Sequence, residues 1–283
     1  ILYILNYVDK VSANNEELKG KILAILFFEP STRTRLSFEC AMKRLGGNVI
    51  GFSDWRDSSV AKGEDLKDTI KVIDGYADAI VIRHPAPGSA KIAADAAEHP
   101  VINGGDGSNQ HPTQTFLDLY TILKTKGKLE DISIGFLGDL KYGRTVHSLA
   151  RALSNFKAKM FFISPESLKL PNELFGEFSK KTECSEVRDI SNVISELDIL
   201  YMTRIQKERF DFNLVDKKKI NYKIGPYILK KAKKDIKIMH PLPRVGEIKH
   251  DLDNYENAVY FKQAHYGVPV RMALLSLILS NKT

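Results

Sequence analysis

The sequence predicts an α/β protein of two doubly wound domains, each a parallel sheet flanked by helices, with two interdomain helices joining them. Short apolar, β-branched runs alternate with amphipathic stretches, which is the pattern of βα units around a parallel sheet. This pattern restarts near Gly127, and 283 residues suffice for roughly two ordinary domains. We therefore expect domains at residues 1–126 and 127–267, with a C-terminal helix over 268–283 that packs back on the first domain.

In the first half, short apolar runs predict buried strands, and apolar residues spaced three or four apart predict helices. Ile1–Leu5 is apolar but is followed by Asn6 and Asp9, so we interpret it as the end of a helix that starts before the present sequence. The expected strands are Lys21–Phe28, Val49–Phe52, Ala79–Ile82 and Val101–Asn103, and the expected helices are Thr34–Leu45, Asp65–Tyr76, Ser89–Ala97 and Pro112–Lys124.

The second half follows the same alternation. Its last helix, Val268–Leu279, is nearly all apolar and should be buried against a large surface. The expected strands are Ile132–Leu137, Lys159–Ile163, Ile199–Met202 and Lys237–His240, with a helix at Arg144–Leu153.

Composition excludes several classes of function. The apolar start is too short and polar to cross a bilayer and lacks the basic start of a signal peptide, so we expect no membrane partner. Cys40 and Cys184 are far apart and have no partner at metal-ligand spacing, which predicts no disulfide, no metal site and a reducing, cytoplasmic location.

The net charge is modestly positive, since 42 Lys and Arg exceed 35 Asp and Glu by 42 − 35 = 7. Lysine runs at Lys217–Lys219 and Lys230–Lys234 are compatible with a nucleic-acid footprint or with a solvated face. They lack the interleaved aromatic residues of a stacking platform, which favours the solvated face and no nucleic-acid partner.

The most informative stretch is Phe27–Arg35, where a strand ends, Pro30 turns the chain and a helix begins. The free backbone N–H groups and the positive end of the helix dipole lie at such a point. Ser31 and Thr32 can donate hydrogen bonds, and Arg33 can contact two phosphate oxygens. A plain Ser/Thr helix cap is the alternative, but two arginines in the same turn favour an anion site.

Other expected strand ends carry similar side chains. Arg83-His84-Pro85 follows one strand, at the edge where open α/β sheets bind ligands. A glycine-rich turn follows the next strand and leads to His111, which is either an ordinary loop histidine or an acid/base or hydrogen-bonding group. Since cations surround it, we expect His111 to be a neutral donor.

In the second half, Gly138–Thr145 lies between a strand and a helix. Its glycines do not have the spacing of a dinucleotide-binding fingerprint, and Arg144 stands at the helix start. Arg204 and His240–Arg244 follow two further strands. Many arginines without a catalytic carboxylate pair, a Ser-His-Asp set or a metal cluster indicate anionic substrates and catalysis by orientation and charge stabilisation.

Ser31-Thr32-Arg33-Thr34-Arg35 resembles the carbamoyl-phosphate signature of the aspartate/ornithine carbamoyltransferase family, and the resemblance covers nearly the whole chain. It includes Ser58–Glu64, Arg83–Pro85, His111–Gln114, Gly138–Thr145, Tyr201–Arg209 and His240–Arg244. The ornithine branch typically carries His-Cys-Leu-Pro at the position of His240–Pro243, and Arg204-x-Gln206 is similar to the aspartate branch.

The resemblance implies a carbamoyl-phosphate-binding first domain, an aspartate-binding second domain, transfer of a carbamoyl group to L-aspartate in pyrimidine biosynthesis, and no cofactor. Arg33, Thr34 and His111 would be catalytic, and Glu29 and Arg209 would stabilise domain closure. Carbamoyl phosphate would contact Ser31, Thr32, Arg33, Thr34, Ser58, Lys62, Arg83, His111, Gln114, Pro241 and Leu242, and aspartate would contact Lys62, Arg144, Arg204 and Gln206.

The family also forms homotrimers, in which Ser58 and Lys62 would reach a neighbouring active site, and in some organisms it binds zinc-containing regulatory chains. Two alternatives stay open. One is an ornithine-type or other carbamoyltransferase, and the other is a non-catalytic anion- or nucleic-acid-binding module.

Overall fold

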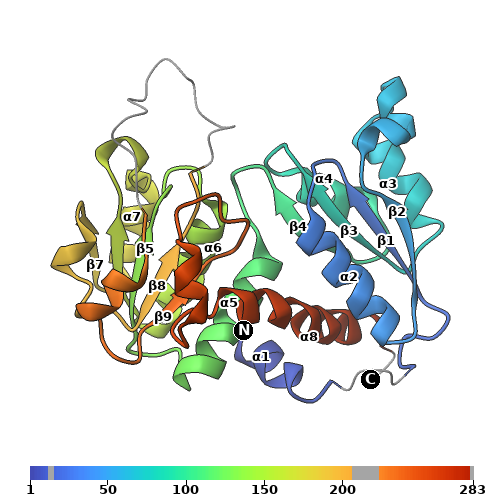
Figure 1. Cartoon of the computed structure of the whole chain (residues 1–283). Coiled ribbons are helices and arrows are strands. Elements are labelled where there is room, and N and C mark those ends of the chain that lie inside the picture. The colour runs from blue at the N-terminus through green and yellow to red at the C-terminus, as the bar shows by residue number, and fades with distance from the viewer. Residues whose placement is uncertain (12–15, 206–222, 281–283) are drawn as a thin grey trace. The chain divides into compact units, whose positions relative to one another are not determined.

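The computed structural model describes residues 1–11, 16–205 and 223–280 (Figure 1). The chain forms two compact units: unit 1 is Ile1–Tyr120 with His265–Thr283, and unit 2 is Thr121–Ala264. Each boundary falls inside a helix, α5 (Pro112–Lys126) or α8 (Tyr260–Leu279), so both helices belong to both units. The boundaries expected from the sequence, after Lys126 and Gly267, lie a few residues further along.

Unit 1 contains a four-stranded parallel sheet in the order β2-β1-β3-β4. Its elements are α1 (Leu2–Val8), β1 (Ile22–Phe27), α2 (Thr32–Arg44), β2 (Asn48–Phe52), α3 (Leu66–Asp74), β3 (Ala79–His84), α4 (Ser89–Ala96) and β4 (Val101–Asp106), with 3-10 turns at Trp55–Asp57 and Ser59–Lys62.

Helices cover both faces of this sheet, as Figure 1 shows. Alternate residues of a strand point to opposite faces, and β1 is apolar at every position because both of its faces are buried. Leu23, Ile25 and Phe27 pack with α2 and the end of α8, whereas Ala24 and Leu26 pack with α3 and α4.

Helix α1 is attached to α8 by hydrogen bonds. The Tyr7 hydroxyl lies 3.0 Å from Ser276 Oγ, and Ser276 Oγ donates to Glu17 Oε1 at 2.8 Å. The Tyr120 hydroxyl donates to Asp9 at 2.7 Å. Residues from both ends of the chain therefore stabilise unit 1 together.

Unit 2 contains a five-stranded parallel sheet in the order β7-β6-β5-β8-β9. Its elements are β5 (Ser133–Leu137), α6 (Arg144–Leu153), β6 (Lys159–Ile163), α7 (Asn172–Ser179), β7 (Cys184–Val187), β8 (Ile199–Met202) and β9 (Lys237–Met239), with 3-10 turns at Ser154–Phe156, Glu166–Leu168, Ile190–Asn192, Pro226–Lys230 and His250–Asn254.

Aromatic rings fill one side of this second sheet. The rings of Phe136 and Phe162 stack with centroids 5.5 Å apart, and Phe175 and Phe178 of α7 pack against Phe162. The opposite side is mostly aliphatic, with Leu137, Leu200 and Ile238 in one buried cluster. Two parallel sheets flanked by helices confirm the expected fold class.

The largest differences from the sequence expectation concern three elements. Strand β7 and helix α7 were not expected, and α8 begins at Tyr260 rather than Val268 because it continues through Gly267 and Pro269. Among the described residues, none of the helices is both long and apolar enough to span a bilayer.

Candidate active site

In unit 1 the sheet has a topological switch point between β1 and β3. The chain goes from β1 to β2 on one side and then returns to β3 on the other side of β1. The loops after β1 and β3 therefore diverge, and open α/β sheets bind ligands at this position. Pro30–Thr34 follows β1, and Arg83 and His84 end β3, so the expected phosphate-binding residues come from this point.

The first turn of α2 is suited to an anion. The helix starts at Thr32, two residues earlier than expected, with Ser31 as N-cap, and the Ser31 side chain makes no capping hydrogen bond. The first turn contains no acidic residue, and Arg33 is exposed there. A cation at a helix N-terminus is unfavourable to the dipole, and a bound anion would reverse that effect. Thr34 is buried.

The Arg83 guanidinium connects the ends of three strands. Its Nη2 lies 2.8 Å from Glu29 Oε1, in the loop after β1. Its Nη1 donates to the Gly104 carbonyl of β4 at 3.3 Å and lies 3.3 Å from His111 Nε2. Arg83 therefore fixes the distance between the expected phosphate site and His111. Glu29, expected to act in domain closure, is an Arg83 partner within unit 1.

The protonation of His111 follows from that contact. The imidazole is 5% exposed, and a guanidinium can only donate, so His111 Nε2 is the acceptor. The ring is then neutral and carries its proton on Nδ1. This arrangement leaves Nδ1–H as the donor of the ring.

Asp106 organises the glycine-rich loop before His111, and sequence reasoning missed it. Burial favours the neutral acid, but hydrogen bonds to the carboxylate outweigh burial and lower the pKa of Asp106. Its partners are the side-chain amides of Asn103 and Asn109, each at 2.9 Å, and the backbone N–H groups of Gly88 at 2.9 Å and Gln110 at 3.1 Å. An Asp inside a Gly-rich turn was the available sequence signal.

Ser58 lies between the two 3-10 turns that connect β2 and α3, and Lys62 ends the second turn. The Ser58 hydroxyl donates to the Trp55 carbonyl at 2.6 Å, and Lys62 is exposed. Figure 1 shows this segment extending past the end of the sheet. In the described part of the chain, neither side chain forms a hydrogen bond or ion pair with Arg83, Glu29 or His111.

Unit 2 has its own switch point, between β5 and β8, since β6 and β7 lie on one side of β5 and β8 and β9 on the other. Gly138 follows β5 with φ of +128°, and a Cβ there would lie 2.3 Å from the Thr203 carbonyl oxygen. Only glycine allows this close approach. Arg144 starts α6 and is 7% exposed, and Arg204 follows β8. Gln206 and Arg209 lie outside the described residues.

The loop after β9 holds Pro241 and Leu242 in a defined conformation. Leu242 has φ of +56°, which is uncommon for a non-glycine residue, and its N–H donates to His240 Nδ1 at 2.8 Å. His240 Nε2 lies 2.8 Å from Glu247. Burial favours the neutral acid, yet the bond to His240 lowers the pKa of Glu247. The pair thus fixes the direction of the backbone carbonyls.

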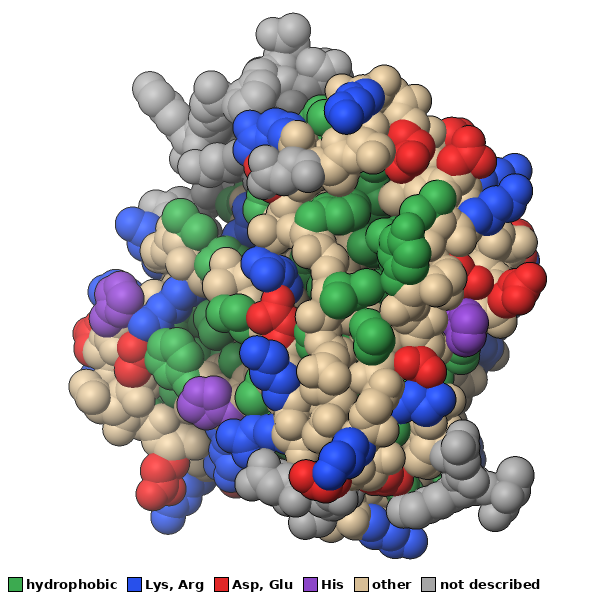
Figure 2. Space-filling view, turned by 90° about the vertical axis from the view of Figure 1, so that its right-hand side faces the viewer, with side chains coloured by type: hydrophobic (Ala, Val, Ile, Leu, Met, Phe, Trp, Pro, Cys, Tyr) green, Lys and Arg blue, Asp and Glu red, His purple; other side chains and the backbone are tan. Residues whose placement is uncertain are grey.

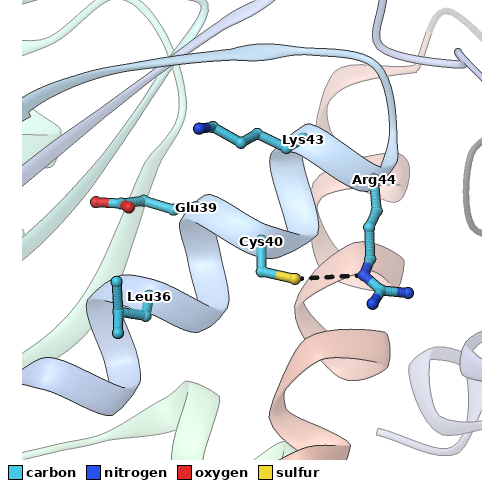
Figure 3. Close-up of a pocket in the computed structure, with 5 residues that line it drawn as sticks. All are labelled: Leu36, Glu39, Cys40, Lys43 and Arg44. Atoms are coloured by element: carbon cyan, nitrogen blue, oxygen red, sulfur yellow. Dashed lines mark hydrogen bonds between the residues drawn. The ribbon is translucent and has the colours of Figure 1, made fainter.

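A separate hollow lies on the outer side of α2, lined by Leu36, Glu39, Cys40, Lys43 and Arg44 (Figure 3). Arg44 Nε donates to Cys40 Sγ at 3.3 Å. It contains none of the expected site residues. Within the described part of the chain, no group of three or more His, Cys, Asp or Glu could hold a metal ion.

These two units define an α/β enzyme that brings arginine side chains to the switch points of two parallel sheets. Residues 2–124 match the family model "Aspartate/ornithine carbamoyltransferase, carbamoyl-P binding domain", and residues 130–278 match "Aspartate/ornithine carbamoyltransferase, Asp/Orn binding domain". The chain therefore belongs to the aspartate/ornithine carbamoyltransferase family and is a carbamoyltransferase.

Individual relatives agree with this assignment. The aspartate carbamoyltransferase catalytic subunit of Thermococcus gammatolerans is 57% identical over 266 residues, which cover 93% of this chain and 86% of that protein. The solved catalytic subunit of M. jannaschii aspartate transcarbamoylase has a TM-score of 0.91 at 51% identity, covering 99% of this chain and 94% of that one. Trypanosoma cruzi aspartate transcarbamoylase with carbamoyl phosphate and aspartate has a TM-score of 0.86 at 36% identity, covering 98% and 89%.

The role of Asp106 predicts a pH-dependent loss of stability in Asp106→Asn. The amide would face backbone donors, so we expect about 1–3 kcal/mol of destabilisation at pH 7. Because folding lowers the pKa of Asp106, its contribution is present above its ordinary pKa of 3.8 and is lost as pH falls through the lower folded value. Urea unfolding between pH 7 and pH 3 should show the difference from wild type shrinking in acid.

The matched control is Asp95→Asn. The exposed carboxylate of Asp95 forms an ion pair with Lys91. It should change stability by less than about 0.5 kcal/mol. A deficit in Asp106→Asn that is equal at every pH would contradict the assigned role.

Proposed function

We propose that this chain transfers the carbamoyl group of carbamoyl phosphate to the amine of L-aspartate, giving N-carbamoyl-L-aspartate and phosphate. The observation that carries this proposal is the contact of Arg83 with His111 at the sheet edge where the loop after β1 leads into α2. The relatives named above support aspartate as the acceptor. The reaction would be an early step of de novo pyrimidine biosynthesis.

The phosphate of the first substrate is held by Ser31, Thr32, Arg33, Thr34 and Arg83. Backbone N–H groups at the start of α2 and two guanidinium groups supply charge-assisted hydrogen bonds to its oxygens. The polar first turn of α2, without an acidic residue, supports this role.

The carbamoyl group is oriented through contacts to its carbonyl oxygen and to its NH2 group. Arg33, Thr34 and the Nδ1–H of His111 stabilise the carbonyl oxygen as it gains negative charge in the tetrahedral intermediate. Gln114 and the backbone carbonyls of Pro241 and Leu242 accept hydrogen bonds from the NH2 group. The fixed conformation of Leu242 supports its part in this role.

The two carboxylates of aspartate are bound by Arg144, Arg204 and Gln206, with Lys62 as a further cation. Arg144 and Arg204 follow the two strands that flank the switch point of unit 2, which supports an anion site there. Glu29 and Arg209 are proposed to stabilise the closed arrangement of the domains. In this scheme the two domains bind carbamoyl phosphate and aspartate respectively.

The reaction needs no side-chain base. The neutral amine of aspartate attacks the carbamoyl carbon, the tetrahedral intermediate collapses with cleavage of the bond to the phosphate oxygen, and the leaving phosphate accepts the amine proton. The protein contributes orientation and charge stabilisation. No cofactor enters any of these steps.

We further propose a homotrimer with shared active sites, in which Ser58 and Lys62 act in a neighbouring subunit. Figure 2 shows hydrophobic side chains gathered on one face of the protein. Leu36, Ile50 and Trp55 are exposed, and β2 is an edge strand. Exposed apolar surface of this kind is typical of interfaces. Binding of a zinc-containing regulatory chain stays a prediction from the family.

A cytoplasmic location is also proposed. Cys40 and Cys184 are both free thiols, which is usual in a reducing compartment. Neither a nucleic acid nor a membrane is proposed as a partner.

The direct experiment is a steady-state assay with carbamoyl phosphate and each amine substrate. Aspartate should be carbamoylated and ornithine should not. Turnover of ornithine instead would place the enzyme on the other branch of the family. Salt-dependent binding to DNA or RNA without any turnover would support the binding-module alternative.

Arg33→Ala should lower kcat by about 10²–10³ without unfolding the protein, because it removes charge stabilisation at the developing oxyanion. Arg35→Ala is the matched control on the same helix, since Arg35 pairs with Glu39 at 2.8 Å. It should stay close to wild-type activity. A normal kcat in an Arg33→Ala variant that also has a normal circular dichroism spectrum would contradict the proposed role of Arg33.

Shared sites predict complementation between Lys62→Ala and Arg33→Ala. Each homotrimer should be nearly inactive, but a mixed trimer contains an interface where intact Arg33 meets intact Lys62. Subunit exchange should then restore about a third of wild-type activity in each mixed trimer. Mass spectrometry would verify the exchange, and activity that stays at the parental level would mean that each site lies within one chain.

A further inference from the structure

Gln114 and Asp118 form a buried pair one turn apart on α5. Gln114 Nε2 donates to Asp118 Oδ1 at 2.9 Å, and the two residues are 9% and 0% exposed. An ionised carboxylate can only accept hydrogen bonds, so the Gln114 amide must present its NH2 end to Asp118. The carbonyl Oε1 is then the end of this amide that is available to another partner.

The charge of Asp118 is balanced by a second buried residue, Arg271 of α8. The Arg271 side chain is 2% exposed, donates to the Gly267 carbonyl at 3.1 Å, and lies over the Phe38 ring at 4.9 Å from its centroid. Burial lowers the pKa of Arg271 to about 9, while the negative charge of Asp118 acts in the opposite direction. Arg271 is therefore cationic at neutral pH, and its charge is attracted to the Asp118 carboxylate.

The orientation of the Gln114 amide has a chemical consequence. Carbamoyl phosphate and acetyl phosphate share the phosphate and the carbonyl, and they differ in an NH2 group against a methyl group of similar size. An NH2 group can donate to Gln114 Oε1, whereas a methyl group would leave that buried acceptor without a hydrogen bond. A site that presents an acceptor therefore discriminates between the two compounds.

We propose that Asp118 is a positioning residue that fixes the Gln114 amide with its Oε1 toward the substrate, so that the site selects a carbamoyl group over an acyl group. This inference rests on the proposed carbamoyl transfer. A flipped amide would bring two acceptor oxygens together at Asp118, which is unfavourable. An asparagine at this position can pair with either orientation of the amide and would remove the preference.

The test is the variant Asp118→Asn, which keeps the shape of the side chain. Three constants are measured in steady state: KM for carbamoyl phosphate and the competitive inhibition constants of acetyl phosphate and inorganic phosphate. We expect KM for carbamoyl phosphate to rise about twofold relative to the acetyl phosphate constant, because only about half of the Gln114 amides would then have the competent orientation. The ratio of the acetyl phosphate and phosphate constants should stay unchanged, since both ligands lack the NH2 group.

A parallel change in all three constants would overturn the proposal, because it would reflect altered charge or folding rather than amide orientation. Three unchanged constants would overturn it as well. A double-mutant cycle sharpens the test: in a Gln114→Ala background, Asp118→Asn should not alter the ratio further, since Asp118 acts through Gln114. A further change of the same size would show that Asp118 acts independently.

A measurement on the unsubstituted protein covers the case in which Asp118→Asn fails to fold. NMR of the side-chain amides, with Gln114 assigned by its loss in Gln114→Ala, should find its NH2 protons protected in the same way before and after addition of carbamoyl phosphate. Loss of that protection on binding would mean that the amide turns, and would overturn the inference. If the wild type does not turn over carbamoyl phosphate and aspartate, the proposed function is contradicted instead.

Discussion

The contact on which unit 1 most depends is that of Arg83 with Glu29, Gly104 and His111. One guanidinium group joins the loop after β1, the end of β4 and the residue before α5, all within 3.3 Å. The loops after β1 and β3 diverge at the switch point, and this link holds together the groups that we propose to meet the substrate. The 14% exposure of the Arg83 side chain limits competition from water. Charge is thus positioned before substrate binds, as electrostatic catalysis requires.

Unit 1 also contains buried charged residues that have no proposed contact with the substrate. Asp106, Asp118 and Arg271 are each at most 2% exposed. Asp106 accepts hydrogen bonds along one loop, and Arg271 balances Asp118. A buried charge costs free energy unless it is paired and hydrogen-bonded, so these groups strongly restrict the local conformation. Exposed residues such as Arg33 can then act on an anion with less rearrangement.

The residues at the strand ends were easier to find in the sequence than the buried charges. Arg33, Arg83 and His111 follow apolar runs, so their place at a sheet edge can be read from local pattern. The buried pairing cannot, because α8 meets α5 across 158 residues, as Thr113 and Arg271 illustrate. A lone arginine inside the apolar last helix was the available signal. For the fold, β7 was missed because Cys184–Val187 is half exposed and does not alternate clearly.

The two units reach a similar arrangement from different sequences, which indicates that the constraint is geometric. Both have a switch point and an arginine near the start of the following helix, at Arg33 and Arg144. Both also have an arginine at or just after the end of the neighbouring strand, at Arg83 and Arg204. Carbamoyl phosphate and aspartate are both anions, so two positive sheet edges suit one substrate each. The units differ in their buried supports: unit 1 orients an amide through Asp118, whereas unit 2 orients backbone carbonyls through His240 and Glu247. Each support thus fixes oxygen acceptors within its own unit.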